Sequence, residues 1–228
     1  MSQKDLLKEI SNSTNFVELV SITPNAEEVI TFCARVSNPG NQTNMDTSDK
    51  LIKYLLTHKH WSPFELAHMT IQIKTSRAIA AQILRHRSFT FQEFSQRYAV
   101  ASNNVFYRAR RQDTKNRQNS VDDMPQSDID WFIEAQNQVW SLAKEKYDEA
   151  LARGIAKEQA RFLLPLSTET TIYMSGSIRS WMTYLIVRME KGTQLEHKEI
   201  ARDCYKVFKQ EMPNMALAFE ECHPDLFT

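Results

Sequence analysis

The 228-residue sequence is poor in glycine and in cysteine. Its four glycines are too far apart to form a GxGxxG turn or a Walker-type phosphate loop: Gly40, Gly154, Gly176 and Gly192. The three cysteines are widely spaced, so they predict neither a disulfide framework nor a CxxC metal site. These absences exclude the commonest dehydrogenases and nucleoside triphosphatases. Any bound nucleotide must be held by side chains and helix ends.

The sequence also lacks an excess of charge and any long apolar run. Its 28 basic residues balance 28 acidic ones. A general nucleic-acid coat normally has a basic excess, so we expect no nucleic-acid partner and only local anion binding. No apolar stretch is long enough to span a bilayer, and none follows Met1–Asp5. We therefore expect no membrane partner, no signal peptide and a cytoplasmic protein.

Hydrophobic periodicity predicts strands and helices that do not alternate strictly. Strands are expected at about 15–23, 67–74 and 170–174. Helices are expected at about 25–36, with Asn25 as its cap, 48–56, with Ser48 as its cap, 76–87, 128–153, 157–164, 178–190 and 195–211. This order favours an α+β fold, with a mixed, mostly antiparallel sheet packed with long helices. We expect a single domain over 1–228 that assembles as an oligomer.

Several other features have ordinary explanations. The segment 99–126 is rich in Asn, Gln and Arg and predicts a mobile loop, or a loop that orders over an anionic ligand. The tryptophans of helical segments are expected in the core: Trp131, Trp140 and Trp181. His197 and His223 are expected at the surface. No metal site is expected at His58, His60 and His68, which lack a nearby carboxylate set.

The densest group of chemically active residues lies between Gln82 and Tyr98. Arg85, His86 and Arg87 are expected to end a helix, where the helix dipole favours cations. Ser95 and Arg97 follow soon after. Guanidinium groups bind phosphate oxygens in pairs, and a serine hydroxyl adds a short donor. This composition fits a phosphate site without glycine, or a surface salt-bridge cluster.

Arg85-His86-Arg87, followed after seven residues by Ser95-x-Arg97, resembles the signature of the flavin-dependent thymidylate synthases. The resemblance extends from about residue 16 to 211. It includes four further segments: Ala34–Ser37, His60–Glu65, Arg161–Leu166 and Arg179–Arg188.

The resemblance implies a homotetramer that binds FAD and converts dUMP into dTMP. In this family 5,10-methylenetetrahydrofolate gives the carbon and NADPH reduces the flavin. The residues that would bind FAD are Ser62, Arg85, His86, Arg87, Glu93, Ser177, Ile178, Arg179 and Thr183. Those that would bind dUMP are Gln82, Ile83, Leu84, Arg85, Glu93, Phe94, Ser95, Gln96, Arg97, Arg161 and Arg188. Arg188 would be catalytic, because a cation beside the uracil favours its ionised form.

The chain departs from the family pattern at a few positions. Ser177, Thr183 and Gln92 stand where asparagine is common, and the histidine usual near Gly192 is missing. These replacements put individual roles in doubt and leave the resemblance intact.

The spacing within 178–190 has a geometric consequence. If these residues form one helix, Arg179 and Arg188 point to nearly opposite faces. We therefore expect the active site to be built where subunits meet.

Two other hypotheses stay open from the sequence. One is a non-enzymatic nucleotide or RNA binder that uses the arginines of 85–117. The distant matches at Arg161 and Arg188 and the neutral net charge argue against it. The other is a flavoprotein that has lost methylation, which the sequence does not distinguish from the enzyme.

Overall fold

The computed structural model describes residues 16–227. Its main sheet is antiparallel, in the order β1-β2-β6-β3, with bounds Phe16–Ile22, His68–Ser76, Glu169–Ser177 and Thr90–Glu93. Every second residue of β2 is fully buried, namely Met69, Ile71 and Ile73, as the alternation predicted. The expected strands are confirmed, and β6 is longer than expected. Met1–Asp5 and Asn15 lie outside the described residues.

The described residues also form α-helices, with bounds α2 Ala26–Ala34, α3 Ser48–Thr57, α4 Arg77–Ile83, α5 Gln126–Ala152, α6 Lys157–Ala160, α7 Ile178–Met189, α8 Leu195–Glu211 and α9 Pro213–Cys222. Every expected helix is present, which confirms the mixed α and β class. Helix α9 was not predicted. Its signal was Pro213 at the first helical position, where proline is favoured.

The chain divides into two compact units. The first, here called the α5 unit, holds Phe16, 74–85 and 93–172 of the described residues. The second, the α7 unit, holds 17–73, 86–92 and 173–227. Both include parts of β2 and β6. The single domain over 1–228 stays a prediction.

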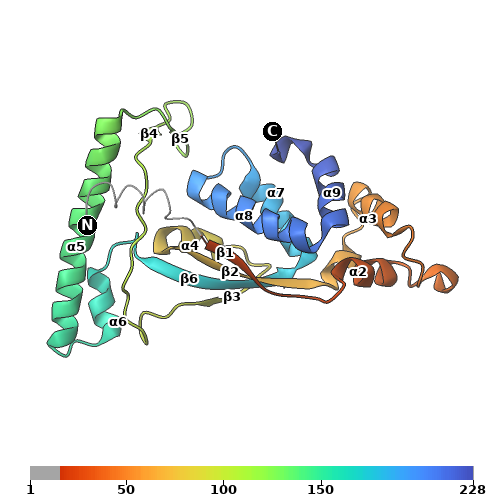
Figure 1. Cartoon of the computed structure of the whole chain (residues 1–228), viewed down its shortest axis with the longest axis horizontal. Coiled ribbons are helices and arrows are strands. Elements are labelled where there is room, and N and C mark those ends of the chain that lie inside the picture. The colour runs from red at the N-terminus through yellow and green to blue at the C-terminus, as the bar shows by residue number, and fades with distance from the viewer. Residues whose placement is uncertain (1–15, 228) are drawn as a thin grey trace. The chain divides into compact units, whose positions relative to one another are not determined.

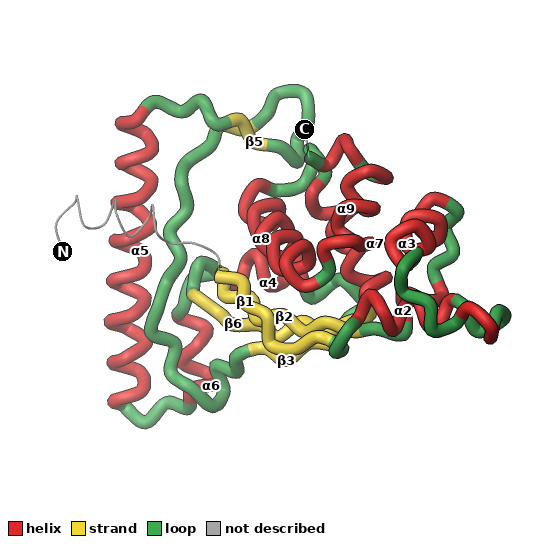
Figure 2. The backbone as a smooth tube through the Cα atoms, turned by 45° about the vertical axis from the view of Figure 1, so that its right-hand side comes forward, coloured by secondary structure: helices red, strands yellow, loops and turns green. Residues whose placement is uncertain are grey.

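Helices α7, α8 and α9 of the α7 unit lie together on one side of its strands (Figures 1 and 2). Trp181 of α7 is fully buried, and its indole Nε1 donates to the Met69 carbonyl oxygen at 2.9 Å. Burying a side chain of this size contributes about 1.5–3 kcal/mol or more to stability. Helix α9 packs against α3 and α8, which closes the core of this unit.

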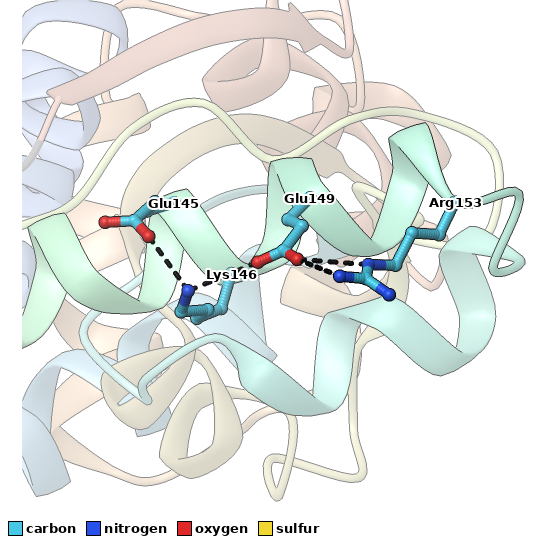
Figure 3. A network of polar contacts seen from close by, with 4 residues as sticks. All are labelled: Glu145, Lys146, Glu149 and Arg153. Carbon is cyan, nitrogen blue, oxygen red and sulfur yellow. Dashed lines mark hydrogen bonds and ion pairs between the residues drawn. The ribbon is translucent and has the colours of Figure 1, made fainter.

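The α5 unit is organised around one long helix. Helix α5 buries two short groups of side chains, one at Ile129 and Ile133 and one around Tyr147. Its exposed face carries a row of ion pairs formed by Glu145, Lys146, Glu149 and Arg153 (Figure 3). Such exposed pairs contribute little to stability. The helix is followed by Gly154, whose φ of 81° suits glycine.

Four local predictions were wrong. Asn25 makes no side-chain cap and has a left-handed φ of 51°. Ser48 is the first residue of α3 and bonds Thr31 instead of capping the helix. Trp131 is 68% exposed, because it lies on the opposite face of α5 from the buried Ile129 and Ile133. His197 is fully buried, since it shares a face of α8 with residues that pack inward.

The segment 99–126, predicted as a loop, contains a short antiparallel ladder of β4 (Arg111–Gln112) and β5 (Ser120–Val121). Two exposed ion pairs accompany it, Arg108 with Asp122 and Arg111 with Asp123. Its mobility, and any closure over a ligand, stay predictions.

No helix among residues 16–227 is long and apolar enough to cross a membrane.

Candidate functional site

The Arg85-His86-Arg87 segment follows a short helix and is not part of it. Ser76 caps α4 by accepting from the backbone N–H of Ile79 at 3.4 Å. The helix ends at Ile83, so the expectation that it continues to Arg87 was wrong. Arg85 and Arg87 are exposed, and neither guanidinium has a hydrogen bond or ion pair with a described residue. Both cations are therefore available to an anionic ligand.

The neighbouring residues that were expected to bind dUMP differ in how far their side chains are exposed. Ile83 is fully buried, so its side chain has no access to a ligand. Leu84 is 36% exposed, so its side chain is accessible. Gln82 and Phe94 are half-buried.

A cavity of about 360 Å³ lies within the α5 unit. Two arginines, one glutamine and an apolar wall line it: Arg77, Gln96, Arg161, Phe162, Leu164, Pro165 and Leu166. Gln96 is only 5% exposed. Arg161 donates through Nε to the Glu158 carbonyl oxygen at 3.2 Å, and its guanidinium lies 5.6 Å from the Phe162 ring centroid. No described carboxylate pairs with Arg161, so its charge is uncompensated.

Glu93, at the end of β3, is fixed by two side chains of the same unit. Its Oε1 accepts from Thr170 Oγ1 at 3.0 Å and lies 3.0 Å from Arg77 Nη1. The backbone N–H of Phe94 donates to the Thr171 carbonyl oxygen at 2.8 Å, which pairs this segment with β6. Sequence reasoning missed both Arg77 and Thr170. Their signal was weak, because neither lies in the motif that defined the site.

Ser95 and Arg97 lie close together, as the spacing predicted. The backbone N–H of Arg97 donates to Ser95 Oγ at 3.4 Å. The Arg97 guanidinium pairs with Glu158 at 3.0 Å, and both side chains are exposed. Solvent screens such a pair, so a stronger anion can displace the carboxylate.

In the α7 unit, Arg188 and His86 are in direct contact. Arg188 Nε donates to His86 Nε2 at 2.8 Å. The His86 ring is T-shaped to Tyr184 at 4.9 Å and to His197 at 6.1 Å between centroids. Burial, and then the nearby Arg188 charge, lowers the pKa of His86 to about 4. The same causes, with His86 as a third, lower the pKa of His197 to about 3, so both rings are neutral at pH 7.

The start of α7 holds a separate polar group. Ser177 caps the helix by accepting from the backbone N–H of Ser180, and its hydroxyl donates to Glu65 Oε2 at 2.6 Å. Arg179 Nη1 lies 2.9 Å from Glu65 Oε1. Thr183 Oγ1 donates to the Arg179 carbonyl oxygen at 3.1 Å. These expected flavin residues therefore have partners within the chain.

Two other expected flavin residues flank this group. Ser62 is exposed at the start of a 3₁₀ turn, Ser62–Glu65. The Ile178 side chain is fully buried. The contact of Glu65 with α7 could not be predicted from the sequence.

Arg179 and Arg188 lie on one continuous helix, as predicted, and have different partners. Arg179 meets the carboxylate of Glu65, whereas Arg188 meets the neutral ring of His86. Their nine-residue separation places them on opposite faces. One arginine is charge-compensated and the other is not.

Gly176 sits where β6 approaches Phe89, three residues after His86. A Cβ atom at Gly176 would lie 2.6 Å from Phe89 Cδ1, closer than packed atoms allow. Phe89 is buried, and its ring is T-shaped to Trp181 at 4.9 Å. The absent side chain lets this ring pack between β6 and α7.

A family model described as thymidylate synthase complementing protein matches residues 18–214. A relative from Paramecium bursaria Chlorella virus 1, named probable flavin-dependent thymidylate synthase, is 55% identical over 196 residues, or 86% of this chain and 91% of its own. A flavin-dependent thymidylate synthase from Synechocystis is 53% identical over 194 residues, 85% of this chain and 89% of its own.

A solved structure is similar as well. It is a UMP/dUMP methylase, PolB, from Streptomyces cacaoi, bound with 5-Br dUMP. The two chains are 26% identical, with a TM-score of 0.81 over 91% of this chain and 95% of that one. The chain belongs to the flavin-dependent thymidylate synthase family.

Proposed function

We propose that this chain is an enzyme that reductively methylates dUMP to dTMP. FAD is its cofactor, 5,10-methylenetetrahydrofolate is the carbon donor and NADPH is the reductant. The observation that supports this most is the 53–55% identity to curated flavin-dependent thymidylate synthases over nearly their whole length. The uncompensated arginines of the two units are chemically consistent with it.

The residues present fit a nucleotide phosphate and a flavin cofactor. Arg161 in the 360 Å³ cavity offers a cation and Gln96 offers an amide, beside an apolar wall. We propose that they bind dUMP with Ser95, Arg97 and Gln82. Arg85 and Arg87 have exposed, unpaired guanidiniums suited to the phosphates of FAD or dUMP. A bound flavin would supply the redox and one-carbon chemistry, while these residues hold and orient it.

We propose that Arg188 acts on the uracil. A fixed cation next to the pyrimidine carbonyls stabilises negative charge that develops on the ring, which makes its carbon a better nucleophile. Glu93, fixed by Arg77 and Thr170, orients the substrate and the flavin. Ser62, Ser177, Arg179 and Thr183 contribute to the flavin side, with the Glu65 network keeping the start of α7 in place.

We also propose that the enzyme works in the cytoplasm as a homotetramer, with sites formed where subunits meet. The opposite orientations of Arg179 and Arg188 on α7 support shared sites. Sedimentation of the active protein tests the assembly. A fully active monomer would refute it.

The function itself is tested by an anaerobic assay. Purified protein, dUMP, 5,10-methylenetetrahydrofolate and NADPH should yield dTMP, and added FAD should raise the yield of any flavin-depleted sample. UMP is assayed in parallel, because the similar solved structure is titled a UMP/dUMP methylase. A colourless protein that makes no dTMP but binds RNA with a steep salt dependence would support the RNA-binding alternative instead.

A further inference from the structure

Arg188 and His86 meet across 102 positions of sequence, with 2.8 Å between Nε of the arginine and Nε2 of the histidine. A guanidinium carries only hydrogen-bond donors, so the nitrogen that faces it must carry a lone pair. His86 Nε2 is therefore unprotonated. A neutral ring then holds its single proton on Nδ1, which fixes the tautomer.

The surroundings of His86 restrict its ring. The edge contact with Tyr184 has a centroid distance of 4.9 Å and an interplanar angle of 79°. His197 lies at 6.1 Å and 90°. The titratable side chains that face His86 are thus Arg188 and Tyr184 from α7 and His197 from α8. Tyr184 and His197 are buried, which leaves the imidazole little room to rotate.

We propose that His86 is a positioning residue for Arg188, orienting the guanidinium through Nε2 while leaving its charge and terminal amino groups for the uracil base. This inference rests on the proposed function, which places Arg188 beside the base. The positioning role of His86 would be in addition to the flavin contact expected from the motif. With Nε2 occupied by Arg188, the ring has only Nδ1–H and its faces for other partners.

The contrast within α7 explains why a histidine serves here. Arg179 on the opposite face meets Glu65, and the carboxylate cancels its charge. A carboxylate behind Arg188 would likewise reduce the field at the base. A neutral imidazole supplies the acceptor without the charge. Burial keeps the pKa of His86 at about 4, so the acceptor persists across the neutral pH range.

The first test uses two amide variants of His86. The amide oxygen of glutamine reaches the position of Nε2, whereas that of asparagine is closer to the position of Nδ1. At saturating dUMP and FAD, we expect His86→Gln to keep kcat within about fivefold of wild type. We expect His86→Asn to lose on the order of 10- to 100-fold, because a misplaced catalytic group is costly. Equal losses in the two variants would contradict the proposal.

The second test is a double-mutant cycle with Arg188→Ala. If His86 acts through Arg188, then His86→Asn should lower kcat much less in the Arg188→Ala background than in wild type. Glu149→Ala, on the exposed face of α5, serves as the control pair and should combine additively. The same factor for His86→Asn in both backgrounds would overturn the positioning role, because it would show that His86 acts independently.

The third test needs no turnover. In ¹⁵N-histidine NMR of the whole protein, His86→Gln identifies the His86 signals, and Nε2 should appear unprotonated at pH 7. Arg188→Gln should shift that Nε2 signal, and Glu149→Ala should not. A protonated Nε2, or no shift with Arg188→Gln, would refute the contact. A wild-type protein that makes no dTMP yet passes this test would refute the proposed function alone.

Discussion

Two arginines of the α5 unit are held differently from Arg188 of the α7 unit. Arg77 meets Glu93 and Arg97 meets Glu158, so both of these cations have a carboxylate partner. In the α7 unit, Arg188 meets the neutral His86. A carboxylate orients an arginine and cancels its charge, whereas an imidazole orients it and leaves the charge. The partner therefore indicates the role of each arginine. Arg77 and Arg97 are suited to structure and to exchange with a ligand anion, whereas Arg188 is suited to an electrostatic effect on a bound ring.

The largest effect should come from removing the charge at Arg188. We expect Arg188→Ala to lower kcat by about 10²- to 10³-fold, the usual cost of one electrostatic stabiliser. Flavin content, read from the absorbance of the purified protein, should change far less. Retained turnover at saturating dUMP would show that the uncompensated arginine has no special role. Arg188→Lys tests whether charge alone is enough.

Removing Arg161 should affect binding more than turnover. Arg161→Ala deletes a cation of the cavity that has no carboxylate partner, and we expect KM for dUMP to rise by about 10- to 100-fold, as for a lost charge-assisted hydrogen bond. Arg77→Ala is the matched variant. It also releases Glu93, so it should lower both kcat and the affinity. Steady-state kinetics at several dUMP concentrations separate the two patterns, and an unchanged KM in Arg161→Ala would place the phosphate elsewhere.

Arg87 tests the exposed cations outside the cavity. We expect Arg87→Ala to weaken FAD binding by about tenfold, because an unpaired guanidinium is lost from an anion site. Flavin occupancy after purification and a titration of apoprotein with FAD measure this. Lys146→Ala, an exposed cation of α5, is the control. Unchanged flavin content in Arg87→Ala would count against the FAD-binding role that the family resemblance implies for Arg87.

The buried His197 and the half-buried His86 of the α7 unit should make stability depend on pH. Their folded pKa values, about 4 for His86 and about 3 for His197, lie below the ordinary value of 6.5. Between these values the unfolded chain binds more protons, so the free energy of unfolding falls as pH drops below about 6.5. Above that pH the two rings have no such effect.

His197→Gln isolates one of these contributions. The loss of stability between pH 7 and pH 5 should shrink by about 1–2 kcal/mol, measured by urea unfolding at both pH values. His68→Gln replaces an exposed histidine and should leave the pH dependence nearly as in wild type. An equal pH dependence in wild type and His197→Gln would show that His197 is not buried neutral.

The smallest effect is expected on the outer face of the α5 unit. Glu149 pairs with Lys146 and Arg153 in the exposed row of ion pairs. Because water and salt screen these charges, Glu149→Ala should change the free energy of unfolding only slightly. Thermal unfolding at low and high salt measures it. A larger effect would mean that these residues are covered in the assembled protein.

Local patterns predicted most of the fold. The alternation in β2 and the helical spacing in α7 arise from neighbours along the chain, so the sequence contains them. His197 could have been placed as well, because it lies three, four and seven residues before Ile200, Ala201 and Cys204 on the buried face of α8. The polar residues next to His197 in the sequence made this buried face of α8 difficult to recognise.

The candidate site residues stay a prediction, and the sequence could not show how they contact one another. The family resemblance implies roles for Arg85–Arg87, Glu93 and Arg188, and nothing in their spacing could show that His86 contacts Arg188. That contact depends on how α7 packs next to the turn after α4. The networks at Glu65 and Arg77 were missed for the same reason, since long-range packing brings their members together.

The close packing around Gly176 limits which substitutions this protein can tolerate during evolution. Phe89 occupies the space of a side chain at this position, so even alanine must displace an aromatic ring, at a cost of about 1–3 kcal/mol. Phe89 is three residues from His86, so the displacement would reach the turn that carries it. A survey of all single substitutions should find this glycine as intolerant as an active-site residue. Selection would then maintain it without any contact with a ligand.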